Sequence, residues 1–152
     1  KHMPGHGFAA NDSHFQLPII KAGKKELLNN DFAVFKAFCD AEIAMSAHVL
    51  FEKIDPYKAA STSKKIIDII REDIKFTGLL VSDDISMSAL PGDLTKRTTN
   101  LIKAGGDVIL HCNGQLSEMK EIISSGVIPN TLTLSRIASV IEERKKIQHN
   151  TV

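Results

Sequence analysis

The sequence predicts an α/β protein in which parallel strands alternate with helices. Three short apolar segments, at residues 43–49, 79–81 and 108–110, have the lengths and residue types of strands. The segments that follow them carry apolar residues at helical spacing. With 152 residues, 43% of them hydrophobic and 24% charged, the chain can bury a core and is not wholly disordered. Together these features are typical of a parallel sheet with crossover helices.

The first 23 residues are expected to form one long loop. They are rich in Gly, Pro, His, Asn and Asp and show no sustained period. Loops of this length are uncommon in compact domains and are often functional.

The first helix and strand follow this loop. The helical stripe consists of Leu28, Phe32, Phe35 and Cys39. Either Asn29 or Asn30 can cap that helix before Asp31. The strand alternates through Ile43, Met45, Ala47 and Val49 and is expected to end near residues 48–50.

A second helix and strand begin after the break at Asp55-Pro56. Ser61 or Ser63 can cap the helix. Its buried stripe is expected to be Ile66, Ile67, Ile70 and Ile74. Gly78 ends the connection, and residues 79–81 then predict a strand that is buried on both faces.

The alternation repeats after a turn at Pro91-Gly92. The next helix is lined by Leu94, Thr98, Leu101 and Ile102 and closed by Gly105-Gly106. A buried strand at 108–110 precedes a helix that carries Leu116, Met119, Ile122 and Ile123 and stops at Gly126. A last amphipathic helix carries Leu134, Ile137 and Ile141, and its charge run at 142–146 is expected to be solvated.

Composition excludes several classes of function. Nineteen Lys and Arg against eighteen Asp and Glu leave a net charge of +1, which provides no basic field for nucleic acid. Cys39 and Cys112 are isolated and are expected to be reduced thiols, which favours a cytoplasmic location. No apolar run approaches the roughly 20 residues needed to span a membrane, and no secretory signal is visible. Since the chain starts at Lys1, we expect it to be part of a longer sequence.

Polar side chains follow the ends of the expected strands. They are His48, Asp83, Asp84, His111 and Asn113. Because parallel strands place their carboxyl ends on one face, these residues are expected to gather where such folds carry their chemistry. Asp83 suits a nucleophile or a stabiliser of a developing cation, although the spacing alone slightly favours the alternative that Ser82, Asp83 or Asp84 only caps the next segment.

The opening loop offers a second set of reactive groups. Asp12 lies two residues before His14, and a carboxylate so close can orient a histidine that shuttles protons. The commoner alternative is that these side chains satisfy local backbone groups. A zinc site formed by His2, His6, Asp12 and His14 is a weaker alternative, because Pro4 and Gly5 disfavour a helix that would align the first pair. No phosphate-binding glycine loop and no GxSxG motif occurs.

Two long motifs resemble bacterial β-N-acetylglucosaminidases of glycoside hydrolase family 3. The first comprises Lys1-His2-Met3-Pro4-Gly5-His6-Gly7, Asp12-Ser13-His14 and Leu17-Pro18, and the second is Ser82-Asp83-Asp84-Ile85-Ser86-Met87. Met45-Ser46-Ala47-His48-Val49 matches on the intervening strand, so the likeness covers essentially the whole chain.

The resemblance implies a (β/α)8 barrel that releases terminal N-acetylglucosamine from cell-wall fragments with retention of configuration. It implies that Asp83 is the nucleophile, that His14 is the general acid/base and that Asp12 orients it. This differs from the usual pair of carboxylates in glycosidases. Lys1 and His2 match positions that hydrogen-bond sugar hydroxyls, whereas Asp84 is given no catalytic role. No metal or organic cofactor is implied.

The resemblance also implies that this chain supplies only the second half of a barrel, since a complete barrel needs about 250 residues. Residues 1–152 are then expected to form a single partial domain, with the catalytic loop at 1–23, βα units at 24–126 and a C-terminal helix at about 131–147. The first four strands, with Asp and Arg residues that grip the sugar, are not in this sequence. The chain alone is therefore expected to be inactive or nearly so. The alternative function is that of an inactive remnant that binds sugar or associates with another chain through its open strand edges.

Overall fold

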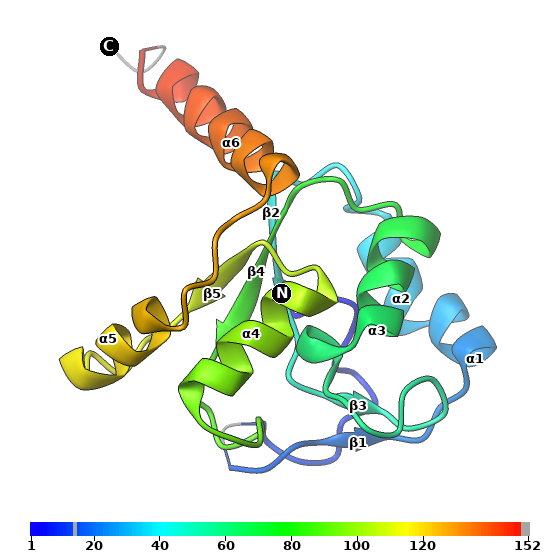
Figure 1. Ribbon diagram of the computed structural model, residues 1–152. Helices are drawn as coiled ribbons and strands as arrows, with labels where there is room; N and C mark the ends of the chain where they lie inside the picture. Colours follow the sequence, from blue (N-terminus) through cyan, green and yellow to red (C-terminus); the bar gives the residue numbers. More distant parts are fainter. Residues whose placement is uncertain (14, 150–152) are drawn as a thin grey trace.

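In the computed structural model, which describes residues 1–13 and 15–149, a three-stranded parallel sheet forms the centre of the molecule (Figure 1). The strand order is β2 (Ile43–Ser46), β4 (Leu79–Asp84) and β5 (Val108–Leu110). Ile43 pairs with Leu79 and Val81 pairs with Val108, and the β4–β5 register shifts before Asp84 meets Leu110. The prediction of parallel strands alternating with helices is therefore confirmed.

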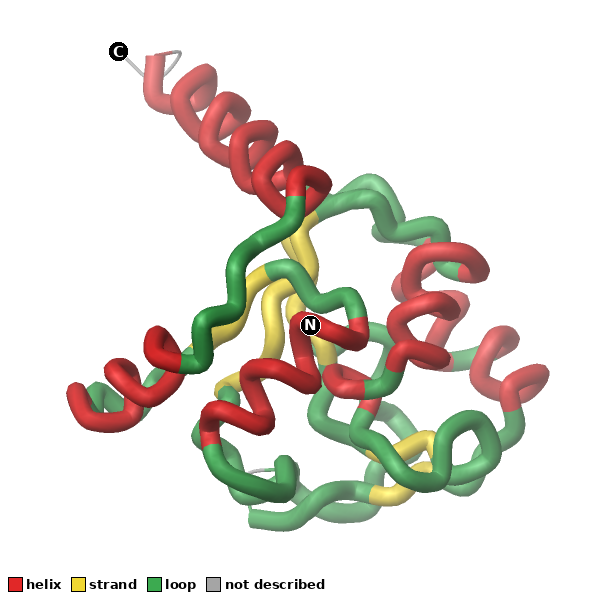
Figure 2. The backbone as a smooth tube through the Cα atoms, viewed as in Figure 1, coloured by secondary structure: helices red, strands yellow, loops and turns green. Residues whose placement is uncertain are grey.

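Helices connect the strands along the chain and lie mostly beside the sheet and in front of it in the view of Figure 2. They are α1 (Lys24–Asn29), α2 (Asp31–Lys36), η1 (Ala60–Thr62), α3 (Lys64–Asp68) with its π-helical continuation η2 (Ile69–Asp73), α4 (Leu94–Ala104), α5 (Leu116–Ser124) and α6 (Thr131–His149). Figure 1 shows α1, α2 and α3 grouped beside the sheet and α4 crossing in front of it, whereas α5 and α6 extend outward.

The main core lies between the sheet and the first helices. Its largest buried side chains include Phe32 and Phe51, whose rings meet edge to face with centroids 5.4 Å apart. The isoleucine stripe of the second helix is buried as predicted: Ile66, Ile67, Ile70 and Ile74. Ser63 provides the cap by accepting a hydrogen bond from the backbone N–H of Ile66 at 3.3 Å. Gly105 closes α4 in the left-handed conformation, with φ of 107°.

Two predicted elements differ from the structure near the start of the chain. The single helix expected through residues 28–39 is two helices, because Asn30 interrupts the helical backbone with φ −121° and ψ −97°. As a result Leu27 is fully buried, Leu28 is only half-buried, and Cys39 lies beyond the end of α2. The strand expected to end near 48–50 ends at Ser46.

A separate two-stranded sheet accounts for the second difference. In it β1 (Ile19–Ile20) pairs in parallel with β3 (Leu50–Phe51). The chain after Ser46 leaves the main sheet to make this pair, and the N–H of Leu50 donates to the carbonyl of Pro18 at 2.8 Å. Strand pairing at β1 therefore anchors the end of the opening loop, although most of the loop is irregular as predicted.

The strand at 108–110 was predicted to be buried, but it is only half-buried. All three residues of β5 are half-buried, since β5 pairs only with β4 among the described residues. No side chain of α5 is buried, and Ile123 is 79% exposed. Ile122 of α5 packs against a small buried cluster that includes Leu94 of α4, but the apolar stripes of α5 and α6 are otherwise half-buried or exposed. The charge run at 142–146 is exposed as predicted.

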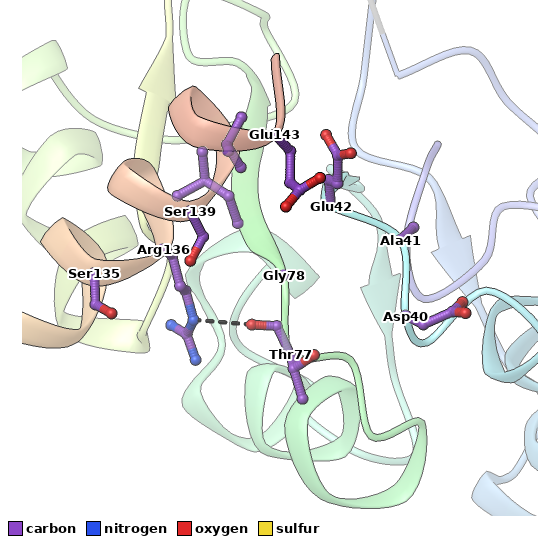
Figure 3. Close-up of a pocket in the computed structure, with 11 residues that line it drawn as sticks. Asp40, Ala41, Glu42, Thr77, Gly78, Ser135, Arg136, Ser139 and Glu143 are labelled. Carbon is purple, nitrogen blue, oxygen red and sulfur yellow. Dashed lines mark hydrogen bonds between the residues drawn. The ribbon is translucent and has the colours of Figure 1, made fainter. Parts of the chain in front are cut away.

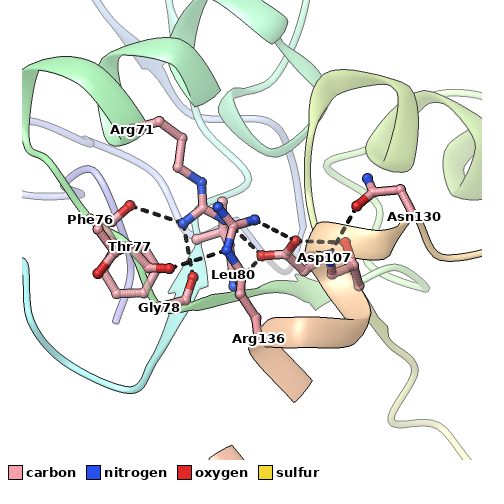
Figure 4. A network of polar contacts seen from close by, with 9 residues as sticks. Arg71, Phe76, Thr77, Gly78, Leu80, Asp107, Asn130 and Arg136 are labelled. Atoms are coloured by element: carbon pink, nitrogen blue, oxygen red, sulfur yellow. Dashed lines mark hydrogen bonds and ion pairs between the residues drawn. The ribbon is translucent and has the colours of Figure 1, made fainter. Parts of the chain in front are cut away.

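The buried carboxylate of Asp107 joins several elements near the start of strands β4 and β5 (Figure 4). Asp107 precedes β5, and its Oδ2 accepts from Arg71 Nη2 at 2.7 Å and from the backbone N–H of Leu80 at 2.9 Å. Its Oδ1 accepts from Thr133 Oγ1 and Arg136 Nη1, both at 2.8 Å. One side chain therefore fixes η2, β4 and the start of α6 relative to one another.

Candidate active site

The candidate site lies at the carboxyl end of β4, where the sequence predicted it. Asp83 and Asp84 are the last two residues of this strand. The Asp83 side chain is 15% exposed, so it is sheltered but reachable from solvent. A carboxylate in such a position must be hydrogen-bonded or solvated to remain ionised.

The opening segment of the chain brings His2 to Asp83. Met3 forms a parallel bridge with Ser46, where its N–H donates to the Met45 carbonyl at 2.6 Å. This places His2 Nε2 3.5 Å from Asp83 Oδ2, and the His2 side chain is 30% exposed. Two of the predicted site residues, one at the start of the chain and one past its middle, are therefore neighbours.

The charge state of His2 follows from this placement. Burial lowers the pKa of the imidazole below its ordinary value of 6.5, the carboxylate of Asp83 opposes that change, and electrostatic interaction with Lys1 reinforces it. His2 is thus favoured as a neutral ring at neutral pH. A neutral imidazole can both donate and accept hydrogen bonds with a polar ligand.

Asp84 forms the turn behind Asp83. Its N–H donates to Asp83 Oδ1 at 2.9 Å. Its own carboxylate accepts from the N–H and hydroxyl of Ser86, at 3.0 and 2.8 Å, and from the N–H of Cys112 at 3.2 Å. Partial burial raises the pKa of Asp84, but these hydrogen bonds and the nearby His111 outweigh it, so the net pKa is lowered. Asp84 therefore stays ionised and holds the turn.

His48 contacts this turn through a hydrogen bond to the main chain of Asp84. Its imidazole is fully buried, with Nδ1 2.8 Å from Ser61 Oγ and Nε2 3.1 Å from the carbonyl oxygen of Asp84. Burial lowers the pKa of His48, and Arg97 adds to this effect, whereas Asp83 and Asp84 oppose it. The sequence placed His48 on this face but gave no sign of its partner Ser61, which was predicted only as a helix cap.

The end of β5 completes the polar rim. His111 Nε2 lies 2.7 Å from Glu118 Oε2, which also accepts from Asn113 Nδ2 at 2.7 Å. These hydrogen bonds, that of His111 first, lower the pKa of Glu118. Glu118 was not singled out from the sequence, because its place in the first turn of α5 gives no sign of these contacts.

The opening loop is tied back to α2. The N–H of Gly7 donates to Asp31 Oδ1 at 2.7 Å. Gly5 has φ of 152°, and a Cβ there would lie 2.4 Å from the Asp31 Cβ. These glycines thus allow the loop to pass close to α2. They serve this close approach and form no phosphate-binding motif, in agreement with the sequence analysis.

The remaining predicted site residues occupy this loop. Lys1 and Asp12 are exposed. His14, the expected acid/base, lies outside the described residues. The geometry of the described residues therefore supplies a sheltered carboxylate, Asp83, and a neighbouring neutral imidazole, His2.

Among the described residues of the predicted zinc alternative, the structure brings His2 and His6 close together. The rings of His2 and His6 lie 5.9 Å apart and are tilted by 57°. Across residues 1–13 and 15–149, no three His, Cys, Asp or Glu side chains form a group that could hold a metal ion. His14, the fourth residue of that alternative, falls outside this range.

A separate cavity lies at the opposite end of the strands (Figure 3). It has a volume of about 240 Å³ and lies where β2 and β4 begin. The residues that line it include Glu42, Thr77, Arg136, Ser139 and Glu143. Because β4 runs from Leu79 to Asp84, this cavity is remote from Asp83 and takes no part in the candidate site.

No helix in the described part of the chain is both long enough and apolar enough to cross a membrane.

A family model matches residues 1–142 of the chain: the glycosyl hydrolase family 3 N terminal domain. Among curated relatives, a beta-hexosaminidase from Methylobacillus flagellatus is 33% identical over 117 residues, which cover 74% of this chain and 34% of that protein. A beta-hexosaminidase from Haemophilus ducreyi is 29% identical over 149 residues, covering 95% of this chain and 43% of that protein. The chain thus spans well under half the length of these relatives.

The chain is also similar to solved structures, and it again covers less than half of each of them. CbsA from Thermotoga neapolitana is 30% identical, with a TM-score of 0.80 over 95% of this chain and 35% of that one. NagZ from Neisseria gonorrhoeae is 32% identical, with a TM-score of 0.76 over 90% of this chain and 40% of that one. The same NagZ has also been solved in complex with N-trifluoroacetyl-D-glucosamine, where the TM-score is 0.75 over 91% of this chain and 40% of that one.

Proposed function

Because the chain belongs to glycosyl hydrolase family 3, we propose that its protein is a retaining glycoside hydrolase that releases terminal N-acetylglucosamine from peptidoglycan-derived fragments. The observation that carries this proposal is the carboxylate of Asp83, sheltered at the end of β4 beside His2. The α/β fold prediction, part of a barrel, agrees with the family match. Within it we propose that residues 1–152 belong to a single partial domain.

Asp83 is the nucleophile in this proposal. One of its oxygens attacks the anomeric carbon of the sugar while the bond to the leaving oxygen breaks, and a glycosyl-enzyme ester forms. Water then attacks the same carbon from the face that the leaving group vacated, and the carboxylate departs. Two inversions give net retention of configuration.

His14 is the proposed acid and base for these steps. It protonates the leaving oxygen in the first step and removes a proton from water in the second. Asp12, two residues earlier, would orient its imidazole. This assignment rests on the family resemblance of the 12–14 segment.

His2 and Lys1 are the proposed sugar-binding residues. His2 reaches the nucleophile at 3.5 Å, and its lowered pKa favours a neutral ring that can exchange hydrogen bonds with hydroxyl groups. The exposed ammonium of Lys1 can donate to the same sugar. The NagZ relative solved in complex with N-trifluoroacetyl-D-glucosamine supports an amino sugar as the substrate class.

The test is release of a chromogenic phenol from its N-acetyl-β-glucosaminide by the complete protein. Asp83→Ala should lower kcat by about 10⁴-fold or more, a loss typical of removing a nucleophile. Asp68→Ala, which removes a half-buried carboxylate of α3 that pairs with Lys64, is the matched control and should leave the rate unchanged. Phenol release that survives Asp83→Ala would exclude this mechanism.

Chemical rescue gives a second readout. In Asp83→Ala, azide can occupy the space of the lost carboxylate and attack the anomeric carbon itself. The product should be the α-glycosyl azide, since only one inversion then occurs. A β-glycosyl azide would place the nucleophile elsewhere.

The second candidate function is an inactive module that only binds sugar or associates with another chain, and it is favoured by the half-buried strand β5, which pairs on one side only among the described residues. We expect the 152-residue chain alone to show little or no turnover while the complete protein is active. Sugar titration and sedimentation of this chain would then show whether it binds sugar or associates with another chain. We propose a cytoplasmic location, which the two unpaired cysteines, Cys39 and Cys112, support.

A further inference from the structure

We propose that His48 is a positioning residue for the nucleophile: its buried imidazole fixes Asp83 through the main chain of Asp84. This inference rests on the proposed function, in which Asp83 attacks the sugar. His48 itself touches neither Asp83 by a hydrogen bond nor, in this proposal, the substrate.

The direction of the two hydrogen bonds determines the tautomer of His48. The carbonyl oxygen of Asp84 can only accept, so His48 Nε2, 3.1 Å away, must carry the proton and donate. In the neutral ring Nδ1 is then an acceptor, and the hydroxyl of Ser61 donates to it at 2.8 Å. Both ring nitrogens are thereby satisfied, which a fully buried imidazole requires.

Asp84 transmits this restraint to the nucleophile. Its carbonyl is held by His48, its carboxylate by Ser86 and the N–H of Cys112, and its own N–H donates to Asp83 Oδ1. The residue is therefore fixed through its carbonyl, its carboxylate and its N–H, and it retains little freedom to rotate. Oδ1 of Asp83 is engaged in that contact, which leaves Oδ2 as the oxygen that faces the sugar.

The charge of His48 matters as well as its position. Desolvation favours the uncharged ring, and Arg97 acts in the same direction, against the carboxylates of Asp83 and Asp84. A neutral His48 ring adds no positive charge that would offset the negative charge of Asp83. That charge is what stabilises the developing oxocarbenium ion.

Two near-isosteric variants of the complete protein separate the two hydrogen bonds. In His48→Gln the amide nitrogen takes the place of Nε2 and can still donate to the Asp84 carbonyl. In His48→Asn the amide group takes the place of Nδ1, so it can reach Ser61 but not Asp84. Ser61→Ala removes only the hydroxyl partner.

The readout is the rate of phenol release in the first turnover, which reports formation of the glycosyl-enzyme, together with the affinity for N-acetylglucosamine. His48→Asn should slow the first turnover by about 10²-fold, the effect of a displacement of roughly 1 Å at the reacting centre. His48→Gln should stay within about threefold of the unmodified protein, and Ser61→Ala should fall between them at about tenfold. Product affinity should remain within about twofold in all three, because His48 does not touch the sugar.

A purely structural role would affect His48→Gln and His48→Asn equally, or would weaken product binding along with the rate. Either result overturns the proposal. Should His48→Asn fail to fold, Ser61→Ala carries the test, and an unchanged first-turnover rate in that variant overturns it. If the unmodified protein releases no phenol, the proposed function itself fails; if it is active and only the His48 variants disagree, the positioning role alone is wrong.

Discussion

Removing the Asp107 carboxylate should destabilise the protein more than any exposed substitution. In Asp107→Ala the buried N–H of Leu80 loses its acceptor, and the partly buried cations Arg71 and Arg136 lose their counter-charge. Breaking a buried ion pair by deleting one partner costs about 3–5 kcal/mol, and an unpaired buried N–H adds about 1–3 kcal/mol. Allowing for overlap between these effects, we expect the free energy of unfolding to fall by about 4–6 kcal/mol.

Asp107→Asn should cost less, for a reason that the geometry gives. The amide oxygen can keep the Oδ2 position, where it still accepts from Leu80 and Arg71, and the amide nitrogen can donate to the hydroxyl of Thr133. Only Arg136 must find another partner, and it already donates to the Thr77 carbonyl. We expect a loss of about 2–3 kcal/mol for this variant.

The assay is urea unfolding of the complete protein, followed by circular dichroism, with Glu143→Ala as the matched control. Glu143 is an exposed carboxylate paired with Lys146, and its loss should change stability by less than about 1 kcal/mol. If all three variants unfold with the same midpoint, the reasoning about Asp107 is wrong. If Asn and Ala are equally destabilising, the assignment of hydrogen bonds to the two oxygens is wrong.

Three further predictions concern particular side chains. Burial lowers the pKa of His48, so between pH 6.5 and the lower pKa of the folded state the unfolded chain binds a proton that the folded protein does not. The free energy of unfolding should therefore fall as the pH drops through this range. If the urea midpoint of His48→Gln changes with pH as steeply as that of the unmodified protein, this reasoning is wrong. Ser63→Ala should lower stability by about 1–2 kcal/mol, because it removes both the cap of α3 and the hydroxyl that donates to the buried Asp55 carboxylate at 2.7 Å; an unchanged midpoint would mean that neither contact is needed. Gly78→Ala would place a Cβ 2.3 Å from the carbonyl oxygen of Ala41, so we expect the free energy of unfolding to fall by about 3 kcal/mol or more. Gly23→Ala is the control and should be tolerated, because nothing lies within 4 Å of its Cβ position. Equal thermal midpoints for the two variants would contradict the steric argument.

Local patterns predicted the helices well where the restraint is itself local. The isoleucine stripe of 66–74 is buried because its 3.6-residue period is a property of the helix alone. Ser63 caps that helix and Gly105 ends α4, since each acts within a few residues of its own position. The first helix was predicted wrongly, because a stripe that continues through 28–39 does not reveal the break in the backbone at Asn30.

Strand burial was harder to predict, since it depends on neighbours elsewhere in the chain. Val108 to Leu110 are as apolar as a buried strand, yet they are half-buried because β5 pairs on one side only among the described residues. The strand expected through Val49 ends at Ser46 because Leu50 pairs instead with the opening loop. Neither fact is encoded in the local alternation of residues.

The candidate site residues were predicted from the sequence, and the tertiary structure shows which of them lie close together. Order and spacing within the two long motifs were enough to select Asp83, His2 and the 12–14 segment, because catalytic residue types in a fixed pattern are rare by chance. Only the folded chain decided that His2 lies beside Asp83, and that His48 and Ser61, thirteen positions apart, hold the turn behind it. The physical reason is that hydrogen bonds and desolvation act over a few ångströms in space, whatever the separation along the chain.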